Sequence, residues 1–344
     1  MFSRGKNHLQ GYHGPFTMKQ ALQQPQALKN TRKIVIKCVV SCLLLGYLLS
    51  KTNLPAIKLA LEAANWFWIS VAFALHIIGF WLTALRWQML LAARDAHFSQ
   101  WELAIAALIG IFFNNFLPST VGGDVYRAYH TAAKVGSMTE ALTVVAVERL
   151  TGIFALGLFG FIALPLGFAH FGKIPIIWSA FGGLLLVFLL FLAALNQRVA
   201  QRIRRLFEHP DMLKIPAVRK IQAKLKQIYA ALCVYRRNKR VLAAAFLLGL
   251  LLQANVILHY YVIAYALQFH VSWQYFFLMI PVATIVLLVP VFINGIGGRE
   301  LTFILLFGKF GVSASAAIAF SWIAFGMLLV QGMIGGIVYA VRKD

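Results

Sequence analysis

Two short segments place polar and helix-breaking residues between long apolar runs of the sequence. They are "NNFLPSTVGGDVYRAY" at 114–129 and "NGIGGRE" at 294–300, and each places an arginine close behind a pair of glycines. A helix that begins at such a glycine pair presents free backbone N–H groups and the positive end of its dipole to a ligand. We therefore expect each segment to bind an anion such as a phosphate. The residues of these two candidate substrate sites are Gly122, Gly123, Arg127, Gly297, Gly298 and Arg299.

Further ionisable residues lie within or beside apolar runs: Arg86, Asp124, Glu148, Arg149 and Glu300. Charged groups are costly inside a bilayer, so those that occur there are candidates for function. Two interpretations of the acids stay open: they couple transport to an ion such as a proton, or they neutralise nearby bases and lock the segments in place. Asp124 and Arg127 are three residues apart and can pair along one helical face. Arg86 either contacts the substrate or extends its charged end to the membrane interface.

Catalytic and metal-binding signatures are missing from the sequence. It contains no HExxH, no G-x-S-x-G, no P-loop and no acidic sugar-nucleotide motif. Its three cysteines, Cys38, Cys42 and Cys233, form no disulfide or zinc pattern, and the histidines are scattered. We expect no catalytic residue, no metal, no cofactor and no enzymatic activity.

The composition indicates an all-α polytopic membrane protein. Of 344 residues, 61% are apolar and 12% are charged, and a helical span needs about 20 apolar residues. The net charge of +22 is concentrated near the apolar runs and no soluble basic domain is present, which argues against a nucleic-acid partner. We expect about six full spans, at 34–50, 66–91, 139–165, 175–195, 241–268 and 313–341.

The distribution of lysine and arginine predicts the orientation of these spans. Six of them precede residue 34, and thirteen lie between 198 and 240, so both regions and the C-terminus are expected in the cytoplasm. The segments 101–133 and 273–310 must then each enter and leave on one side, as re-entrant or broken hairpins that open to opposite sides. Matching Gly/Pro interruptions in two halves of a chain are typical of inverted-repeat transporters.

Three regions follow from this pattern. Residues 1–33 form a polar basic cytoplasmic tail, and residues 34–341 form the transmembrane domain with the two hairpins. Within that domain, 197–240 is a basic cytoplasmic loop whose apolar residues recur at spacings of three and four from Ile215 to Leu232. Such an amphipathic helix either gathers anionic lipid headgroups or only anchors the loop.

The sequence also resembles a known family. Four motifs, "ALRWQMLL" (84–91), "GIFFNNFLPSTVGGDVYRAY" (110–129), "VERLTGI" (147–153) and "NGIGGRE" (294–300), resemble the flippase-like family built on the membrane domain of lysylphosphatidylglycerol synthase. The resemblance covers about 34–341 and implies an inner-membrane protein with two re-entrant hairpins that is associated with lipid translocation. It adds Asn115 to the substrate-site candidates. The other matching positions are Arg86, Pro118, Gly122, Gly123, Asp124, Arg127, Glu148, Arg149, Gly297, Gly298 and Glu300.

The full synthase carries a soluble acyltransferase domain that this sequence does not show, so we expect no lysyltransferase activity. The expected function is translocation of a phosphate-bearing lipid between the leaflets of a bacterial inner membrane, without an ATP motif. A membrane-embedded transferase for lipid-linked substrates and an accessory subunit of a lipid or glycan biosynthesis enzyme are the alternatives. The expected partners are anionic phospholipids or lipid-linked phosphates, with a lipid-biosynthesis enzyme and a second copy of the chain as further candidates.

Overall fold

The structure is a computed structural model of the chain. It describes residues 43, 46–50, 53–116, 122–172, 178–179, 182–186, 188–189, 235, 238–288 and 294–342. The expected tail, most of the expected spans 34–50 and 175–195, nearly all of the basic loop 197–240, and Pro118 lie outside the described residues.

Every element in the described part of the chain is helical. The first series is α3 (Leu54–Glu62), α4 (Trp66–Ala92), α5 (Gln100–Phe116), α6 (Gly122–Val135) and α7 (Met138–Phe171). The second series is α12 (Lys239–Ala266), α13 (Trp273–Leu288), α14 (Gly298–Phe307), the 3-10 turn η1 (Gly308–Phe310) and α15 (Ala314–Val341). Among these, α4, α7, α12 and α15 are long and apolar enough to cross a membrane. The chain is therefore a multi-pass helical membrane protein.

The four long helices all begin at an asparagine or a serine. The side chain of Asn65 accepts hydrogen bonds from backbone N–H groups at the start of α4. Ser137, Asn238 and Ser313 do the same for α7, α12 and α15. These caps satisfy N–H groups that have no partner within the helix, so each apolar run starts at a defined residue.

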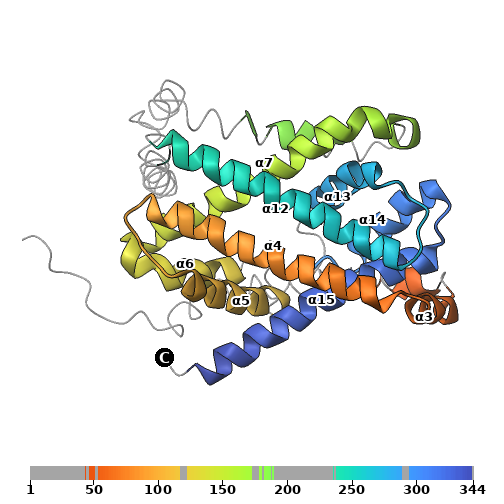
Figure 1. The fold of residues 1–344 in the computed structure, drawn as a ribbon, viewed down its shortest axis with the longest axis horizontal. Helices are drawn as coiled ribbons and strands as arrows, with labels where there is room; N and C mark the ends of the chain where they lie inside the picture. Colours follow the sequence, from red (N-terminus) through yellow and green to blue (C-terminus); the bar gives the residue numbers. More distant parts are fainter. Residues whose placement is uncertain are drawn as a thin grey trace, which may run out of the picture.

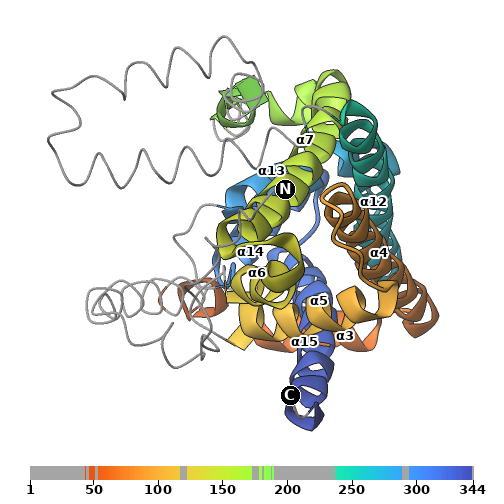
Figure 2. The same cartoon turned by 90° about the vertical axis from the view of Figure 1, so that its left-hand side faces the viewer.

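Helices α4 and α12 form an antiparallel pair and lie side by side along much of their length (Figure 1). The start of α4 meets the end of α12, where the Asn65 N–H donates to the Ala266 carbonyl at 2.9 Å. Helices α5 and α6 lie toward one end of this pair, and α13 and α14 lie toward the other (Figure 1). Figure 2 views the molecule from the first of these ends, near which the C-terminus also lies.

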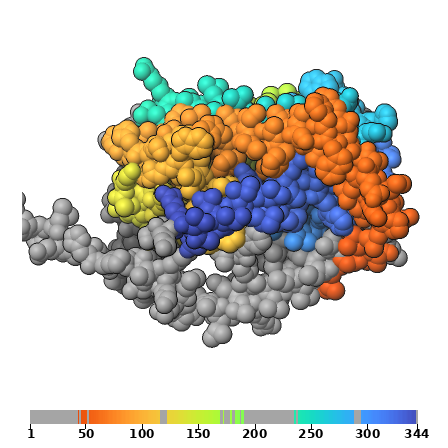
Figure 3. Space-filling view, turned by 60° about the horizontal axis from the view of Figure 1, so that its bottom comes forward, coloured from red at the N-terminus to blue at the C-terminus, as the bar shows by residue number. Residues whose placement is uncertain are grey.

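The two halves of the chain pack across each other. Helix α5 packs against α15, and α13 packs against α7; Figure 3 shows α15 running across one face of the molecule. Glycines permit the closest approaches, as is common in membrane helices. A Cβ atom added to Gly335 of α15 would lie 2.2 Å from the Leu108 carbonyl oxygen of α5. The packing thus depends on direct backbone contact between the halves.

Candidate functional site

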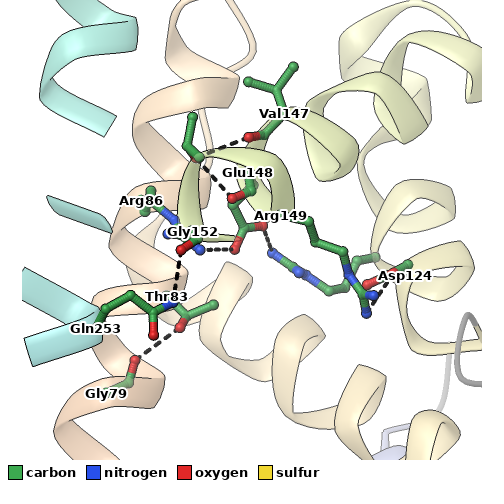
Figure 4. A network of polar contacts seen from close by, with 11 residues as sticks. Gly79, Thr83, Arg86, Asp124, Val147, Glu148, Arg149, Gly152 and Gln253 are labelled. Carbon is green, nitrogen blue, oxygen red and sulfur yellow. Dashed lines mark hydrogen bonds and ion pairs between the residues drawn. The ribbon is translucent and has the colours of Figure 1, made fainter. Parts of the chain in front are cut away.

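A buried ion network joins α4, α6 and α7. Glu148 of α7 accepts from Arg86 Nη2 at 3.2 Å through Oε1 and from Arg127 Nη2 through Oε2 (Figure 4). The exposed fractions of Arg86, Glu148 and Arg127 are 4%, 2% and 8%. One carboxylate therefore neutralises only part of the charge of two buried guanidinium groups.

A second ion pair lies beside this network. Asp124 Oδ2 of α6 is 2.7 Å from Arg149 Nη2 of α7, and the side chain of Arg149 is 44% exposed (Figure 4). The structure thus does not form the pair between Asp124 and Arg127 that their spacing allows. Each of them instead meets one of the adjacent residues Glu148 and Arg149, because α6 packs directly against α7. These contacts agree with the interpretation that acids and bases neutralise one another, and the coupling interpretation stays open.

Neighbouring residues on α7 and α4 leave space for the guanidinium groups of the two buried arginines. A Cβ at Gly152 would lie 2.9 Å from Arg86 Nη1, so a larger residue on α7 would displace the guanidinium. Arg127 lies over the ring of Trp87 at 4.1 Å, a favourable cation–π geometry. Arg86 is buried inside the bundle, and the snorkelling interpretation of this residue is therefore wrong.

The first glycine pair serves close helix packing. A Cβ at Gly123 would lie 2.0 Å from the Gly110 carbonyl oxygen of α5. The Gly123 N–H donates to Asn114 Oδ1 at 2.7 Å, so this amide already has an acceptor within the hairpin. Gly122 begins α6 and is half-buried. The start of α6 is thus held to α5 through Asn114, and an anion site at this helix start stays a prediction.

The second glycine pair lies in a true turn. Asn294, Gly295 and Gly297 have φ values of 50°, 75° and 81°, the left-handed region that glycine tolerates best. The Gly297 N–H donates to Glu300 Oε2 at 2.7 Å, and Ser321 Oγ donates to Glu300 Oε1 at 2.9 Å. Glu300 therefore caps its own helix, which begins with the buried Gly298.

Arg299 and Asn115 belong to the junction between the hairpins. Arg299 donates to the Asn294 carbonyl at 3.0 Å and lies over the Phe325 ring at 4.5 Å. Asn115 donates to the Leu328 carbonyl of α15 at 3.0 Å and accepts from Asn294 Nδ2 at 3.4 Å. Asn115, at the end of α5, and Asn294, before α14, thus lie in contact.

A cavity of about 280 Å³ lies between the first hairpin and the α4–α12 pair. Of the residues expected in the substrate site, Arg127 lines it, and so do the charged Asp124 and Arg149. The polar lining residues that the motifs did not single out are His76, Thr83, Asn114, Asn255, His259 and Gln331. Arg299 and the second glycine pair are not among the described residues that line this cavity. The sequence did contain a signal for His76 and His259, because each of them interrupts a long apolar run.

The charges around this cavity do not balance. Within the described residues, three arginines (Arg86, Arg127 and Arg149) face two carboxylates (Asp124 and Glu148), which leaves one positive charge. Nε of both Arg86 and Arg127 is buried without a hydrogen-bond acceptor in this part of the chain. A small anion at this position would supply the missing charge and acceptors.

Comparison with known proteins agrees with the motifs. No curated protein matches the chain. Residues 34–336, however, match the family described as the lysylphosphatidylglycerol synthase TM region, which suggests a function related to membrane lipids. The match covers most of the chain, and the protein belongs to this family.

Proposed function

We propose that this protein moves a phosphate-bearing lipid between the two leaflets of the inner membrane. The observation that carries the proposal is the cavity lined by Arg127 and Arg149, in which arginines outnumber carboxylates by one. A phosphate diester carries one negative charge and accepts hydrogen bonds from arginine in paired geometry. The headgroup would be held here during its passage across the membrane.

The size of the cavity suits a headgroup and not a whole lipid. Its volume of about 280 Å³ lies at the small end of ligand pockets, which range over roughly 300–1,000 Å³. The acyl chains remain in the surrounding lipid, against exposed apolar side chains such as Leu247, Leu251 and Ile337. Only the polar part of the substrate then needs shelter from hydrocarbon.

The arrangement of the helices supports transport by alternating access. Helices α4–α7 and α12–α15 follow one another in the same order of long and short helices. Each series has a long helix, a hairpin of two shorter helices, and a second long helix. The hairpins lie toward opposite ends of the antiparallel α4–α12 pair, and each packs against the last helix of the other half. We take this as an inverted repeat, whose halves rock about a fixed site near the middle of the membrane.

Basic residues suggest which end faces the cytoplasm. Arg94, Lys134, Lys239, Arg240 and Arg342 all lie at or just beyond the helix ends on the side where α4 ends and α12 begins. The opposite end carries Lys58, which pairs with Glu62, and Lys309. By the positive-inside rule the first of these ends lies in the cytoplasm, so the first hairpin enters from that side.

The experiment is leaflet exchange of a fluorescent phosphatidylglycerol in proteoliposomes. Arg149→Gln should lower the exchange rate about 10- to 100-fold, which corresponds to one lost charge-assisted hydrogen bond of roughly 1.5–3 kcal/mol. Arg240→Gln, an exposed arginine beyond the cavity, is the control and should behave like the wild type. A fluorescent diacylglycerol, which has no phosphate, should show no difference among the three proteins.

A double variant separates the effect of the net charge of the cavity from the effect of the ion pair between Asp124 and Arg149. Arg149→Gln alone removes the excess positive charge and leaves Asp124 without its partner. Adding Asp124→Asn restores the excess of one positive charge, and exchange should recover in part. Wild-type exchange of phosphatidylglycerol in correctly inserted Arg149→Gln would refute the proposal.

A further inference from the structure

Two histidines, the half-buried His76 and the buried His259, line the same cavity where α4 packs against α12. His76 Nε2 lies 2.9 Å from Gln331 Oε1 of α15, and His259 Nδ1 lies 2.8 Å from the Ala72 carbonyl oxygen of α4. The two ring centroids are 5.3 Å apart. Both residues are well inside helices that are long enough to span the membrane. A pair of imidazoles at this depth is expensive unless it serves a purpose.

These hydrogen bonds occupy one nitrogen of each ring, and the other nitrogen has no hydrogen-bond partner among the residues that the structure describes. A carbonyl oxygen only accepts, so His259 donates its proton from Nδ1 and keeps the lone pair on Nε2. With Gln331 Oε1 as its acceptor, His76 donates from Nε2 and keeps the lone pair on Nδ1. Imidazole is the side chain whose unperturbed pKa lies closest to neutrality, so either ring has a nitrogen that can take up a proton.

We propose that the pair of His76 and His259 binds one proton, and that this proton binds together with the anionic headgroup. The proposal rests on the proposed function and adds the coupling ion to it. A second proton is disfavoured because two cationic rings at 5.3 Å repel each other. The pair therefore takes up at most one proton.

The charged groups that face the pair across the cavity come from two helices. Helix α6 contributes Asp124 and Arg127, and α7 contributes Arg149. On α12 the ring of Tyr260 lies against His259 at 5.2 Å. Helices α5 and α15 contribute the uncharged Asn114 and Gln331. With the two arginines and one acid present, the cavity disfavours the proton until an anion arrives.

In this arrangement the phosphate and the proton each change the affinity of the cavity for the other. A phosphate bound at Arg127 and Arg149 adds a negative charge to the cavity that the histidines line, which favours the proton. Coupling is reciprocal, so the proton favours the phosphate by the same factor. One linked proton changes the apparent affinity by at most about tenfold for each pH unit. The headgroup and the proton would thus cross together, and a proton gradient would drive the lipid.

The first test uses the full chain in proteoliposomes with fluorescent phosphatidylglycerol. Exchange by the wild type should rise about 5- to 50-fold when the pH on both sides falls from about 8 to about 6. His76→Gln/His259→Gln keeps polar side chains at both positions and should exchange lipid at a rate that does not change with pH. His270→Gln, at an exposed histidine, should keep the full pH dependence. Exchange without pH dependence in the wild type, or with full pH dependence in the double variant, overturns the proton site and leaves lipid translocation standing.

The second test does not depend on transport. Nitrogen-15 NMR of histidine-labelled wild-type protein in nanodiscs, with signals assigned through the single His→Gln variants, follows the protonation of each ring directly. The pair should take up one proton between about pH 8 and pH 5. The midpoint should move upward when phosphatidylglycerol replaces an uncharged lipid, a shift that histidines with only a structural role would not show. A pair that stays neutral throughout this range overturns the proposal even if no lipid exchange is found.

Discussion

Glu148 is the buried carboxylate that pairs with two buried arginines. It lies 3.2 Å from Arg86 and bonds Arg127 with its other oxygen, and its exposed fraction is 2%. Glu148→Gln keeps the shape of the side chain and removes its charge. Two guanidinium groups then face each other without a counterion, and breaking such a buried pair costs about 3–5 kcal/mol.

The assay is reversible unfolding in mixed detergent micelles, with a double-mutant cycle. We expect Glu148→Gln to lose about 3–5 kcal/mol of unfolding free energy. Adding Arg86→Gln removes one of the two unpaired charges, so the double variant should regain about 0.5–3 kcal/mol. Glu62→Gln is the control: it makes the same chemical change at the pair with Lys58, in which both side chains are mostly exposed. It should cost at most about 1 kcal/mol.

The reasoning is refuted if Glu148→Gln costs no more than Glu62→Gln. It is also refuted if Arg86→Gln makes the Glu148→Gln protein less stable. Either result would mean that this carboxylate does not neutralise the two arginines. The count of three arginines against two carboxylates would then not describe the charge of the cavity.

Two more predictions concern packing and orientation. Gly335→Ala should cost about 1–3 kcal/mol in the same unfolding assay, because its Cβ would lie 2.2 Å from a backbone oxygen of α5. Gly326→Ala on the same helix meets nothing within 4 Å and should be neutral or slightly stabilising; equal costs would show that α5 and α15 do not approach so closely. In a background without native cysteines, Lys134→Cys should react with a membrane-impermeant thiol reagent only from the cytoplasmic side, and Lys309→Cys only from outside. Labelling of both from one side would exclude the inverted repeat.

The sequence predicts the segmentation of this fold well, for a physical reason. Apolar runs and Gly/Pro interruptions are local properties, so the hairpin at 101–133 appears as α5 and α6 within a few residues. The hairpin at 273–310 likewise appears as α13, α14 and η1. The number of full spans stays a prediction for the runs 34–50 and 175–195, most of which lie outside the described residues.

The partners of the polar residues could not be predicted in the same way, because they are set by tertiary packing. Glu148 meets Arg86 across 62 residues, and His76 meets Gln331 across 255. Sequence spacing instead favoured the local pair of Asp124 and Arg127, which the structure does not form. Likewise, a glycine pair in sequence does not reveal whether it allows a turn or a close approach between helices.

The two halves of the proposed repeat differ in chemistry. The first half carries the ion network and lines most of the cavity, whereas α14 packs Phe303 and Phe307 against Phe320 of α15 with ring centroids 4.8–5.8 Å apart. All three rings are at most 1% exposed. If the second half is to open to water in alternating access, each ring exposed costs about 1.5–3 kcal/mol. The protein would rarely reach that state unless a ligand stabilised it. Binding of the anionic headgroup removes the unbalanced positive charge from the first half, and we propose that this supplies the stabilisation.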